Sequence, residues 1–445
     1  MKTTKKIIEN LVALTKRRGF IFPSSEIYGG FSSCYDFGPL GVELKRNIKN
    51  EWWREMTQLS ENIVGLDASI LMNPKVWEAS GHLQGFADEL VECFSCKKRF
   101  KQDETTKAGK CPECQGRLSE PKKFNLMMKT FTGPVENEAA VTYLRAETCQ
   151  GIYVNFKNVL QSMRLKLPFG IAQIGKAFRN EITPKNFIFR MREFEQMEMQ
   201  WFCKKEEAHQ FFEKWKEKRY QWYLKLGIKK ENLRFREVPA VERAHYAVEQ
   251  VDIEYHFPFG WQEIEGIHNR GEWDLSRHTK YSSQDLSYFD PQTKEKYFPH
   301  IVETSVGVER SLLAFLIDAY EEVPGGRTKT TKASKEIEVV LKLSKRLAPI
   351  KVAVLPLLSN KKELVSKARE VFFMLKPAFL CQYDDQGSIG RRYRRQDEQG
   401  TPFALTIDFE TLKDETVTLR DRDTMAQERI KIQDLISVIS SKLVN

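Results

Sequence analysis

The sequence has no long hydrophobic run. The longest, Leu312 to Ile317, is far shorter than the roughly 20 apolar residues that a membrane-spanning helix needs. The first residues, MKTTKKIIENLVALTKRRGF, contain no apolar segment of the signal-peptide type and are typical of an amphipathic helix. We therefore expect a cytoplasmic protein with no membrane partner, whose eight cysteines do not form a disulfide framework.

Two common nucleotide-binding motifs are also missing. The sequence contains no G-x-x-x-x-G-K-[ST] loop and no G-x-G-x-x-G motif after a strand. If the protein binds a nucleotide, we expect the site on an antiparallel sheet rather than in a P-loop or a Rossmann crevice. No internal repeat and no compositionally biased tract are present.

The composition is that of a globular protein with a moderate basic excess. Apolar residues make up 41% and charged residues 30% of the 445 positions, a length that predicts two or three domains. Lys and Arg number 71 against 61 Asp and Glu, which gives a formal net charge of +10. This excess favours a polyanionic partner, although a solvated basic surface is the commoner reason for it.

Four of the cysteines are clustered in a short, charged segment. Two C-x-x-C pairs at this spacing can place four thiolates around one zinc ion, with all four positions filled by sulfur as in structural sites. A segment this short buries little apolar surface, so the metal would supply much of its folding energy. The alternative is two reduced pairs in a mobile loop. The predicted ligands are Cys93, Cys96, Cys111 and Cys114.

The stretch FRNEITPKNFIFRMREFEQME, residues 178–198, combines arginines, glutamates and phenylalanines in an unusual way. At the strand period of two, Arg179 and Glu181 share one face, and a turn is expected at 183–186. Such a sheet face offers cations, an aromatic ring and hydrogen-bond acceptors, which suits an anionic ligand with an aromatic group. The return half of the hairpin places on one face Arg190, Arg192, Phe194, Gln196 and Glu198.

The chain divides into segments of different character. Strands alternating with helices predict a small separate α/β domain at the C-terminus, after the linker-like VPGGRTKTTKASKE. The expected segments are 1–90 (first part of a large domain), 91–120 (cysteine insertion), 121–345 (second part of the large domain, with a helical insertion at 206–251) and 346–445 (C-terminal domain).

These stretches carry a family resemblance. FRNE followed by R-x-x-x-F and Glu resembles motif 2 of the class II aminoacyl-tRNA synthetases, and GVERSLLAFL resembles their motif 3. Nearly the whole chain resembles the glycine-specific, homodimeric type of these enzymes. The stretches that carry this resemblance are SSEIYGGFSSCYDFGPLGVELKRNI, LMNPKVWEASGH, RAETCQGIYVNF, EIEGIHNRGEWDL and GSIGRRYRRQDEQGTPFALTIDF. Small departures are Ala146, Cys149 and Glu309, none of which removes a charge. The resemblance implies an α+β/α/β multidomain fold, with an antiparallel-sheet catalytic domain, flanking helices and an α/β anticodon-binding domain.

The resemblance also implies an ATP site. Arg179 would hold the α-phosphate and the glycine carboxylate, Glu181 would accept from the adenine amino group, and Phe194 would stack on the ring. Arg190 and Arg310 would clamp the terminal phosphates, with Arg179 and Arg310 catalytic; Glu263 and Glu303 would stand near magnesium. Arg192 has no assigned partner and is the expected control. The implied ATP-binding residues are Arg179, Asn180, Glu181, Phe189, Arg190, Met191, Arg192, Glu193, Phe194, Glu263, Ile264, Gly307, Val308, Glu309 and Arg310.

A carboxylate-rich glycine pocket is implied as well. Three glutamates would surround the ammonium group, and a tight pocket would exclude every side chain, so that no editing domain is needed. The implied glycine-binding residues are Arg99, Glu147, Phe194, Glu195, Gln196, Met197, Glu198, Arg270, Glu303, Thr304, Ser305, Val306 and Gly307.

The implied activity is the ATP-dependent joining of glycine to the 3′ end of tRNA(Gly), with AMP and pyrophosphate released. The implied partners are ATP with Mg²⁺, glycine, tRNA(Gly) and a second subunit bound through DFGPLGVELKRNIKNEWW, whose tryptophans would otherwise be exposed. Two alternatives stay open: a synthetase for another amino acid, and a non-enzymatic RNA-binding protein. The arginine-rich IGRRYRRQDEQG suits single-stranded RNA, or is a solvated basic turn.

Overall fold

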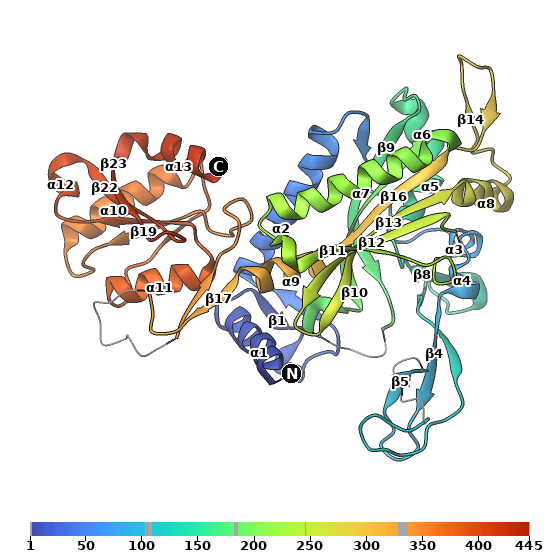
Figure 1. Cartoon of the computed structure of the whole chain (residues 1–445), viewed down its shortest axis with the longest axis horizontal. Helices are drawn as coiled ribbons and strands as arrows, with labels where there is room; N and C mark the ends of the chain where they lie inside the picture. Colours follow the sequence, from blue (N-terminus) through green and yellow to red (C-terminus); the bar gives the residue numbers. More distant parts are fainter. Residues whose placement is uncertain are drawn as a thin grey trace.

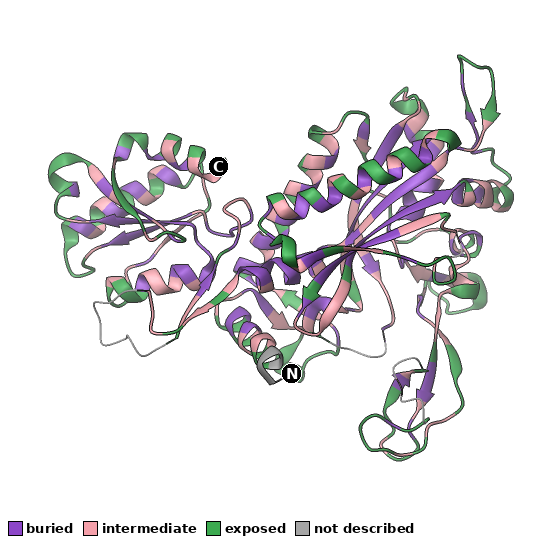
Figure 2. Cartoon of the chain, in the orientation of Figure 1, coloured by how far each residue is buried: buried purple, intermediate pink, exposed green. Residues whose placement is uncertain are grey.

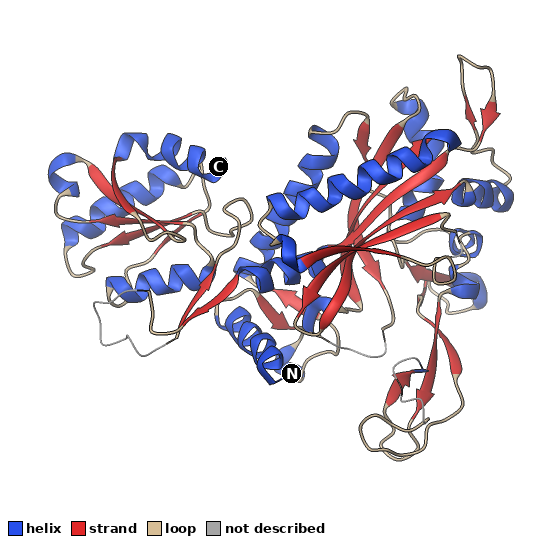
Figure 3. Cartoon of the chain, in the orientation of Figure 1, coloured by secondary structure: helices blue, strands red, loops and turns tan. Residues whose placement is uncertain are grey.

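A computed structural model describes residues 2–102, 105, 109–181, 186–244, 246–327 and 337–444 of the chain. Figure 1 shows a large body built on one twisted sheet, a small module that projects from it, and a C-terminal domain at the other end. Predominantly buried strands form the centre of the large body, with helices packed against them (Figures 2 and 3). No helix in the described ranges is long and apolar enough to cross a membrane.

The sheet of the large body has seven strands in the order β11-β12-β13-β16-β10-β9-β3. All neighbours pair antiparallel except β3 and β9, which are parallel. The strands are β3 (Ile63–Gly65), β9 (Phe169–Phe178), β10 (Glu193–Cys203), β11 (Leu233–Glu237), β12 (Glu249–Phe257), β13 (Gly260–Gly271) and β16 (His300–Gly307).

Alternation along β10 gives the sheet two different faces. Met197, Met199 and Trp201 belong to the main hydrophobic core, whereas Glu198 and Gln200 on the other face are buried and polar. The core also contains residues of the helices α2 (Pro39–Trp53), α7 (Ala208–Lys225) and α9 (Val308–Ala319). A second core on the polar side is built by α5 (Cys149–Val154), α6 (Phe156–Ser162) and α8 (Trp273–Ser282).

The predicted helical insertion at 206–251 is helical only in its first half. α7 ends at Lys225, and Gly227 follows with a φ of +99°, a conformation that glycine adopts without the steric cost of a side chain. The alternating LRFRE then forms β11, which pairs with β12 at the edge of the main sheet. This part of the prediction is therefore wrong, because the second half of the segment completes the sheet.

Further elements frame the large body. They are α1 (Lys2–Arg17), β1 (Ile21–Pro23), β2 (Tyr35–Phe37), α3 (Pro74–Ala79), α4 (His82–Gly85), β7 (Met128–Phe131), β8 (Val141–Leu144), β14 (Tyr288–Phe289), β15 (Lys296–Tyr297), β17 (Tyr320–Val323) and β18 (Glu338–Leu341). Most of the predicted linker lies outside the described residues; on either side of it β17 and β18 pair antiparallel.

The projecting cysteine module is a three-stranded sheet of β4 (Ala87–Glu92), β5 (Arg99–Lys101) and β6 (Lys122–Asn125). Its core is very small, with Val91 and Phe100 packed against cysteines. Apolar burial therefore contributes little to holding this module together.

The C-terminal domain has the predicted α/β character. Its sheet has the order β20-β19-β21-β22-β23, with parallel pairing around β19 and antiparallel pairing beyond β21. Its elements are β19 (Val352–Pro356), α10 (Lys362–Leu375), β20 (Cys381–Tyr383), α11 (Ile389–Gln399), β21 (Phe403–Ile407), α12 (Thr411–Asp414), β22 (Thr416–Asp421), β23 (Gln427–Lys431) and α13 (Leu435–Val444).

The arginine-rich segment is the helix α11 and not a solvated turn. Arg392 is 2% exposed and donates to the carbonyl oxygen of Gly387, and Arg395 makes a two-pronged pair with Asp384 at 2.8 and 2.9 Å. Two of these arginines therefore stabilise the domain itself.

Candidate active site

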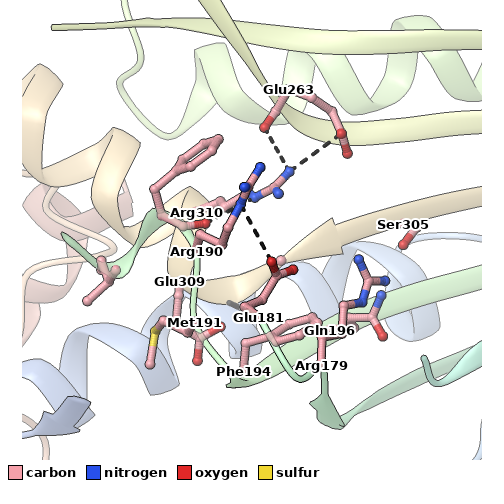
Figure 4. A pocket seen from close by; sticks show the side chains of 13 residues that line it. Arg179, Glu181, Arg190, Met191, Phe194, Gln196, Glu263, Ser305, Glu309 and Arg310 are labelled. Carbon is pink, nitrogen blue, oxygen red and sulfur yellow. Dashed lines mark hydrogen bonds and ion pairs between the residues drawn. The ribbon is translucent and has the colours of Figure 1, made fainter. Parts of the chain in front are cut away.

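The polar face of the sheet contains a pocket where β10, β13 and β16 meet the first turn of α9. Figure 4 shows Arg190 and Arg310 on the side of Glu263, with Arg179 next to Phe194 across the pocket. The lining residues are Arg179, Glu181, Ile188, Phe189, Arg190, Met191, Phe194, Gln196, Glu263, Ser305, Gly307, Glu309 and Arg310.

Arg179 follows directly after β9 and presents its guanidinium group to this pocket. The guanidinium carbon lies 5.2 Å from the ring centroid of Phe194 and 5.3 Å from that of Phe86. Its Nε donates to the carbonyl oxygen of Ala146 at 3.3 Å, and no ion pair with a carboxylate occurs within the described residues. A fixed positive charge without a carboxylate partner is suited to bind an anionic ligand.

Glu181 is nearly buried beside Arg190. The Nε of Arg190 lies 3.9 Å from its Oε2, which has no hydrogen-bond partner in the part of the chain that the structure describes. A buried acceptor of this kind is available to a ligand donor such as an amino group. The expected turn at 183–186 lies outside the described residues, except for Asn186.

Arg310 belongs to the first turn of α9 and closes the other side of the pocket. Its Nη1 donates to the carbonyl oxygen of Glu263 at 3.2 Å and lies 3.4 Å from the Glu263 carboxylate. The guanidinium carbon stands 4.5 Å from the ring centroid of Phe189. A cation beside the N-terminus of a helix makes this corner favourable for phosphate.

Three glutamates from different elements meet beside the pocket. Glu198 accepts from Ser305 Oγ at 2.6 Å and from Thr148, and Glu303 accepts from Arg270 Nη1 at 3.0 Å. Glu147 precedes α5, whereas Glu198 and Glu303 stand on the neighbouring strands β10 and β16. The structure thus brings together acidic residues that are far apart in the sequence.

Each carboxylate in this cluster has additional polar contacts. Glu147 accepts from Gln150 Nε2 at 2.9 Å and lies 3.5 Å from His82 Nε2. Glu303 accepts from Gln200 Nε2 at 2.8 Å and lies 2.8 Å from His268 Nδ1. These contacts fix the carboxylates in place.

The electrostatics of the cluster favour a bound cation. Burial raises the pKa of Glu198 to about 7, and the charges of Glu303 and Glu147 add to this. Although burial opposes it, Arg270 lowers the pKa of Glu303 to about 2, and His82 holds that of Glu147 well below its usual value. Arg270 also donates to both carboxylate oxygens of Asp274, at 2.7 and 2.9 Å. Because its single positive charge is shared between Asp274 and Glu303, the cluster keeps an excess of negative charge.

Several predicted site residues have side chains that point elsewhere. Glu195 lies on the opposite face of β10, where it pairs with Lys45 at 2.7 Å and Lys49 at 2.9 Å. Strand alternation explains this, because every second side chain faces the helices. These side chains do not line the pocket, and the assignment of these residues to the binding site stays a prediction. Side chains buried on the helix-facing side of the sheet or in the core are those of Met197, Ile264, Thr304, Val306 and Val308.

Four more predicted residues lie outside both the pocket lining and the carboxylate cluster beside it. Glu193 pairs with Lys176 at 2.5 Å on an exposed surface. Arg99 pairs with Glu92 at 3.0 Å within the cysteine module. The other two are Asn180 and Arg192.

Arg192 has definite partners, contrary to the prediction. Its Nε donates to the carbonyl oxygen of Glu181 at 3.0 Å, and its Nη1 donates to that of Ser32 at 3.2 Å. The guanidinium group also lies over Phe31, at 5.3 Å. Arg192 therefore connects the hairpin to the loop before β2 and is not an inert control.

Sequence reasoning missed several contributors to the site, among them Phe86, Thr148, Gln150 and Gln200. Phe86 stacks on Arg179, while Thr148 and Gln150 hold the carboxylates. Thr148 and Gln150 both closely follow a predicted residue, Glu147, in the chain, and their polar character was the only available signal. For Phe86, which is distant in sequence, no signal existed.

The four clustered cysteines converge in the module. The Sγ atoms of Cys93 and Cys114 are 3.5 Å apart, and those of Cys96 and Cys111 are 3.7 Å apart. All four sulfur atoms lie within 4.8 Å of one another. Hydrogen bonding from the backbone at Cys96 lowers the pKa of Cys93 to about 6, which favours the thiolate at this position. Although a backbone hydrogen bond at Lys98 opposes it, burial and the neighbouring Cys93 raise the pKa of Cys96 to about 12. This donor set fits a tetrahedral zinc ion.

Comparison with known proteins identifies the class to which this fold and site belong. Residues 131–320 match the family model "tRNA synthetase class II core domain (G, H, P, S and T)", and residues 351–442 match "Anticodon binding domain". The first matched region covers every strand of the sheet that bears the pocket except β3, and the second coincides with the C-terminal domain. Fold and site together define a class II aminoacyl-tRNA synthetase.

Full-length relatives narrow this further. The glycine–tRNA ligase of Treponema denticola is 51% identical over 450 residues, covering 100% of this chain and 99% of the relative. That of Thermobifida fusca is 50% identical, again over 100% of this chain and 99% of the relative. That of Borreliella burgdorferi (strain B31) is 51% identical over 98% of both chains. The chain belongs to the glycine–tRNA ligase family.

Proposed function

We propose that the protein is a glycine–tRNA ligase that activates glycine with ATP and transfers it to the 3′ end of tRNA(Gly). The observation that carries this proposal is the buried cluster of Glu147, Glu198 and Glu303 together with the guanidinium group of Arg179, which has no carboxylate partner within the described residues. A zwitterion with one ammonium and one carboxylate group satisfies both at once. The full-length relatives named as glycine–tRNA ligases support the same substrate.

In the proposed complex the carboxylates bind the glycine ammonium group, and Arg179 binds its carboxylate together with the ATP α-phosphate. Phe194 stacks on adenine, and Glu181 accepts from the adenine amino group. Arg190 and Arg310 bind the terminal phosphates. The remaining predicted binding residues contribute their backbone or hold these side chains in position.

Magnesium fits one of its two predicted carboxylates. Glu263 is half exposed at the pocket, whereas Glu303 is 2% exposed and already bonded to Arg270 and Gln200. We therefore assign Glu303 to glycine and Glu263 to the metal, with the ATP phosphates supplying further oxygen ligands. When bound, Mg²⁺ neutralises phosphate charge.

The reaction then needs no protein nucleophile. A carboxylate oxygen of glycine bonds to the α-phosphorus, the bond from that phosphorus to the bridging oxygen breaks, and pyrophosphate leaves. Arg179 stabilises the charge that spreads over the phosphoryl oxygens, so catalysis is positioning plus electrostatics. A terminal ribose hydroxyl of the tRNA next attacks the glycyl carbonyl carbon and loses its proton, and AMP leaves.

Specificity for glycine follows from the lack of space. The carboxylate cluster beside the pocket is tightly bonded, with Glu198 accepting from Ser305 and Thr148, so that an amino acid with a side chain meets atoms that cannot move freely. No smaller amino acid exists, and editing is therefore unnecessary.

We further propose a structural zinc ion on the four module cysteines, a homodimer, and a cytoplasmic location, where tRNA is used. The predicted reason for the dimer requires correction, because Trp52 is fully buried in the core of its own chain and Trp53 packs partly against that core. Exposed apolar side chains are present instead in the loop before β2, where Ile27 is 88% and Tyr28 87% exposed. We propose that the second subunit covers this loop.

The test of the proposed function is ATP–pyrophosphate exchange on the purified protein with each amino acid in turn. We expect exchange with glycine alone. Exchange with another amino acid would identify a different synthetase, and no exchange with any of them would support an RNA-binding protein without catalytic function.

A further inference from the structure

The guanidinium group of Arg179 lies between two aromatic rings. Phe194 belongs to the motif 2 strand β10, but Phe86 comes from a distant part of the chain and stands at a similar distance, 5.3 Å against 5.2 Å. The one direct hydrogen bond of this side chain in the described residues is the long one from Nε to Ala146. The two rings are therefore the main constraint on the orientation of the guanidinium plane.

Phe86 stands at the base of the cysteine module, between α4 and β4. Its half-buried ring packs against Trp77, Met127 and Ala146 and lies 5.2 Å from the ring of His82. The ring is thus held by residues of the large body while the chain continues from it into the module.

The backbone at the module base is tied to the same hairpin. Phe86 accepts a hydrogen bond at its carbonyl oxygen from the amide of Leu126, at 3.0 Å. Leu126 in turn accepts from the amide of Asn180 at 2.8 Å, directly after Arg179. Both strands that lead into and out of the module therefore connect to the residues that hold the catalytic arginine.

We propose that Phe86 is a positioning residue for Arg179, through which the base of the cysteine module fixes the orientation of the catalytic guanidinium group. The proposal rests on the proposed function, in which Arg179 binds glycine and the α-phosphate. A cation over an aromatic face is held most strongly where water is excluded. Phe86 itself does not touch the reacting atoms.

Replacement of the ring by an aliphatic side chain tests this directly. In Phe86→Leu, we expect the kcat of glycine-dependent pyrophosphate exchange to fall about tenfold, as expected for one lost cation–π contact. Phe86→Tyr keeps the aromatic face and is expected to stay within about twofold of the unaltered protein. Phe94→Leu is the matched control, because Phe94 is an exposed phenylalanine of the same module that faces Arg117.

Three further measurements separate positioning from general packing. The melting temperature of Phe86→Leu and its metal content are expected to match those of Phe94→Leu. In an Arg179→Ala background, Phe86→Leu is expected to cause no further loss. An unchanged kcat for Phe86→Leu, an equal loss in Phe86→Tyr, or additive losses with Arg179→Ala would each overturn the proposal. Failure of the unaltered protein to exchange with glycine would instead refute the proposed function.

Discussion

At the scale of single residues, two arginines of one hairpin illustrate how neighbours acquire different roles. Arg179 presents its guanidinium group to the pocket without a carboxylate partner in the described chain, whereas Arg192 bonds to two backbone carbonyl groups. The residue type and the spacing of these two arginines in the sequence did not distinguish their roles. The difference arises because the loop before β2 reaches only Arg192.

Arg179→Ala is expected to abolish adenylate formation while tRNA binding stays nearly intact. The charge-assisted contact strengthens as the phosphorus becomes five-coordinate, so its loss is expected to cost several kcal/mol, or roughly a thousandfold in rate. Phe194→Leu is expected mainly to raise the KM for ATP, because stacking stabilises ground and transition states alike. Pyrophosphate exchange measures both variants.

The control for these variants is Arg164→Ala, which removes the same charge from an exposed position after α6. Arg164 is chosen as the control position instead of Arg192, because the hydrogen bonds of Arg192 to backbone carbonyl groups make that residue unsuitable. Retention of more than about a tenth of the exchange rate by Arg179→Ala, a loss below roughly 1.4 kcal/mol, would contradict the role of Arg179.

Glycine binding is expected to depend on pH through Glu198. Its pKa is raised to about 7, so the side chain is protonated below that pH and attracts the ammonium group less. The KM for glycine is therefore expected to fall about tenfold between pH 6 and pH 8, while that for ATP changes little. In Glu198→Gln the dependence disappears and the KM stays high. A pH-independent KM in the unaltered protein would rule out this titration.

At the scale of elements, strand β10 joins the site to the helix layer behind it. Its polar-face residues reach the pocket, while Glu195 on the other face meets Lys45 of α2. The same Lys45 bonds to Glu309 at the start of α9, at 2.5 Å. One buried lysine thus connects the two helices and the strand on which the site is built.

Loss of this lysine is expected to destabilise the fold. Although burial opposes it, Glu309 and Glu195 raise the pKa of Lys45, which therefore stays charged. Lys45→Met would leave the buried carboxylate of Glu309 without a cation and Glu195 with Lys49 alone, and is expected to cost about 3 kcal/mol of unfolding free energy. Lys49→Met, which removes a more exposed partner of Glu195, is expected to cost under about 1 kcal/mol. Urea unfolding measures the loss of stability in both variants. Equal losses would contradict the role of Lys45 as the buried cation that joins the strand and the two helices.

The cysteine module is expected to depend on its metal. Because its apolar core is minimal, zinc removal by a chelator is expected to increase proteolysis within 87–125 before the catalytic sheet is affected. Elemental analysis is expected to find one zinc per chain, lost in Cys111→Ser but kept in Cys34→Ser, which alters an isolated cysteine. Protein purified without chelator and free of zinc would contradict this.

At the scale of the whole molecule, the C-terminal domain is connected to the large body by charged contacts. Asp397 of α11 makes a two-pronged pair with Arg420 of β22 at 2.9 and 3.0 Å and also bonds to Arg327. The adjacent Glu398 pairs with Arg18, just after α1, at 2.6 Å. The predicted anticodon-binding domain is therefore tied to both ends of the catalytic domain.

The homodimer is expected to be stable at micromolar concentration. If the second subunit covers the loop with Ile27 and Tyr28, replacement of both by serine is expected to yield monomers without unfolding the chain. Leu358→Ser, at another exposed apolar position in the C-terminal domain, is the control. Sedimentation velocity distinguishes the species, and an active monomer of the unaltered protein would refute the dimer.

The sequence alone determined the class of fold, the zinc ligands as candidates, and the strand face that carries Arg179, Phe194 and Glu198. These features depend on local periodicity and on motifs that are contiguous in the chain. The sequence also predicted a helical insertion over 206–251, of which only the first half is helical. A segment rich in charged and aromatic residues is compatible with either a helix or an edge strand.

Only the tertiary structure decided which charges remain available to a ligand. The pairing of Glu195 with Lys45, of Arg192 with the loop before β2, and of Phe86 with Arg179 all join residues far apart in sequence. Likewise, the pKa of Glu198 is raised because folding buries it near two other carboxylates. Such contacts depend on packing between elements, which local sequence patterns do not encode.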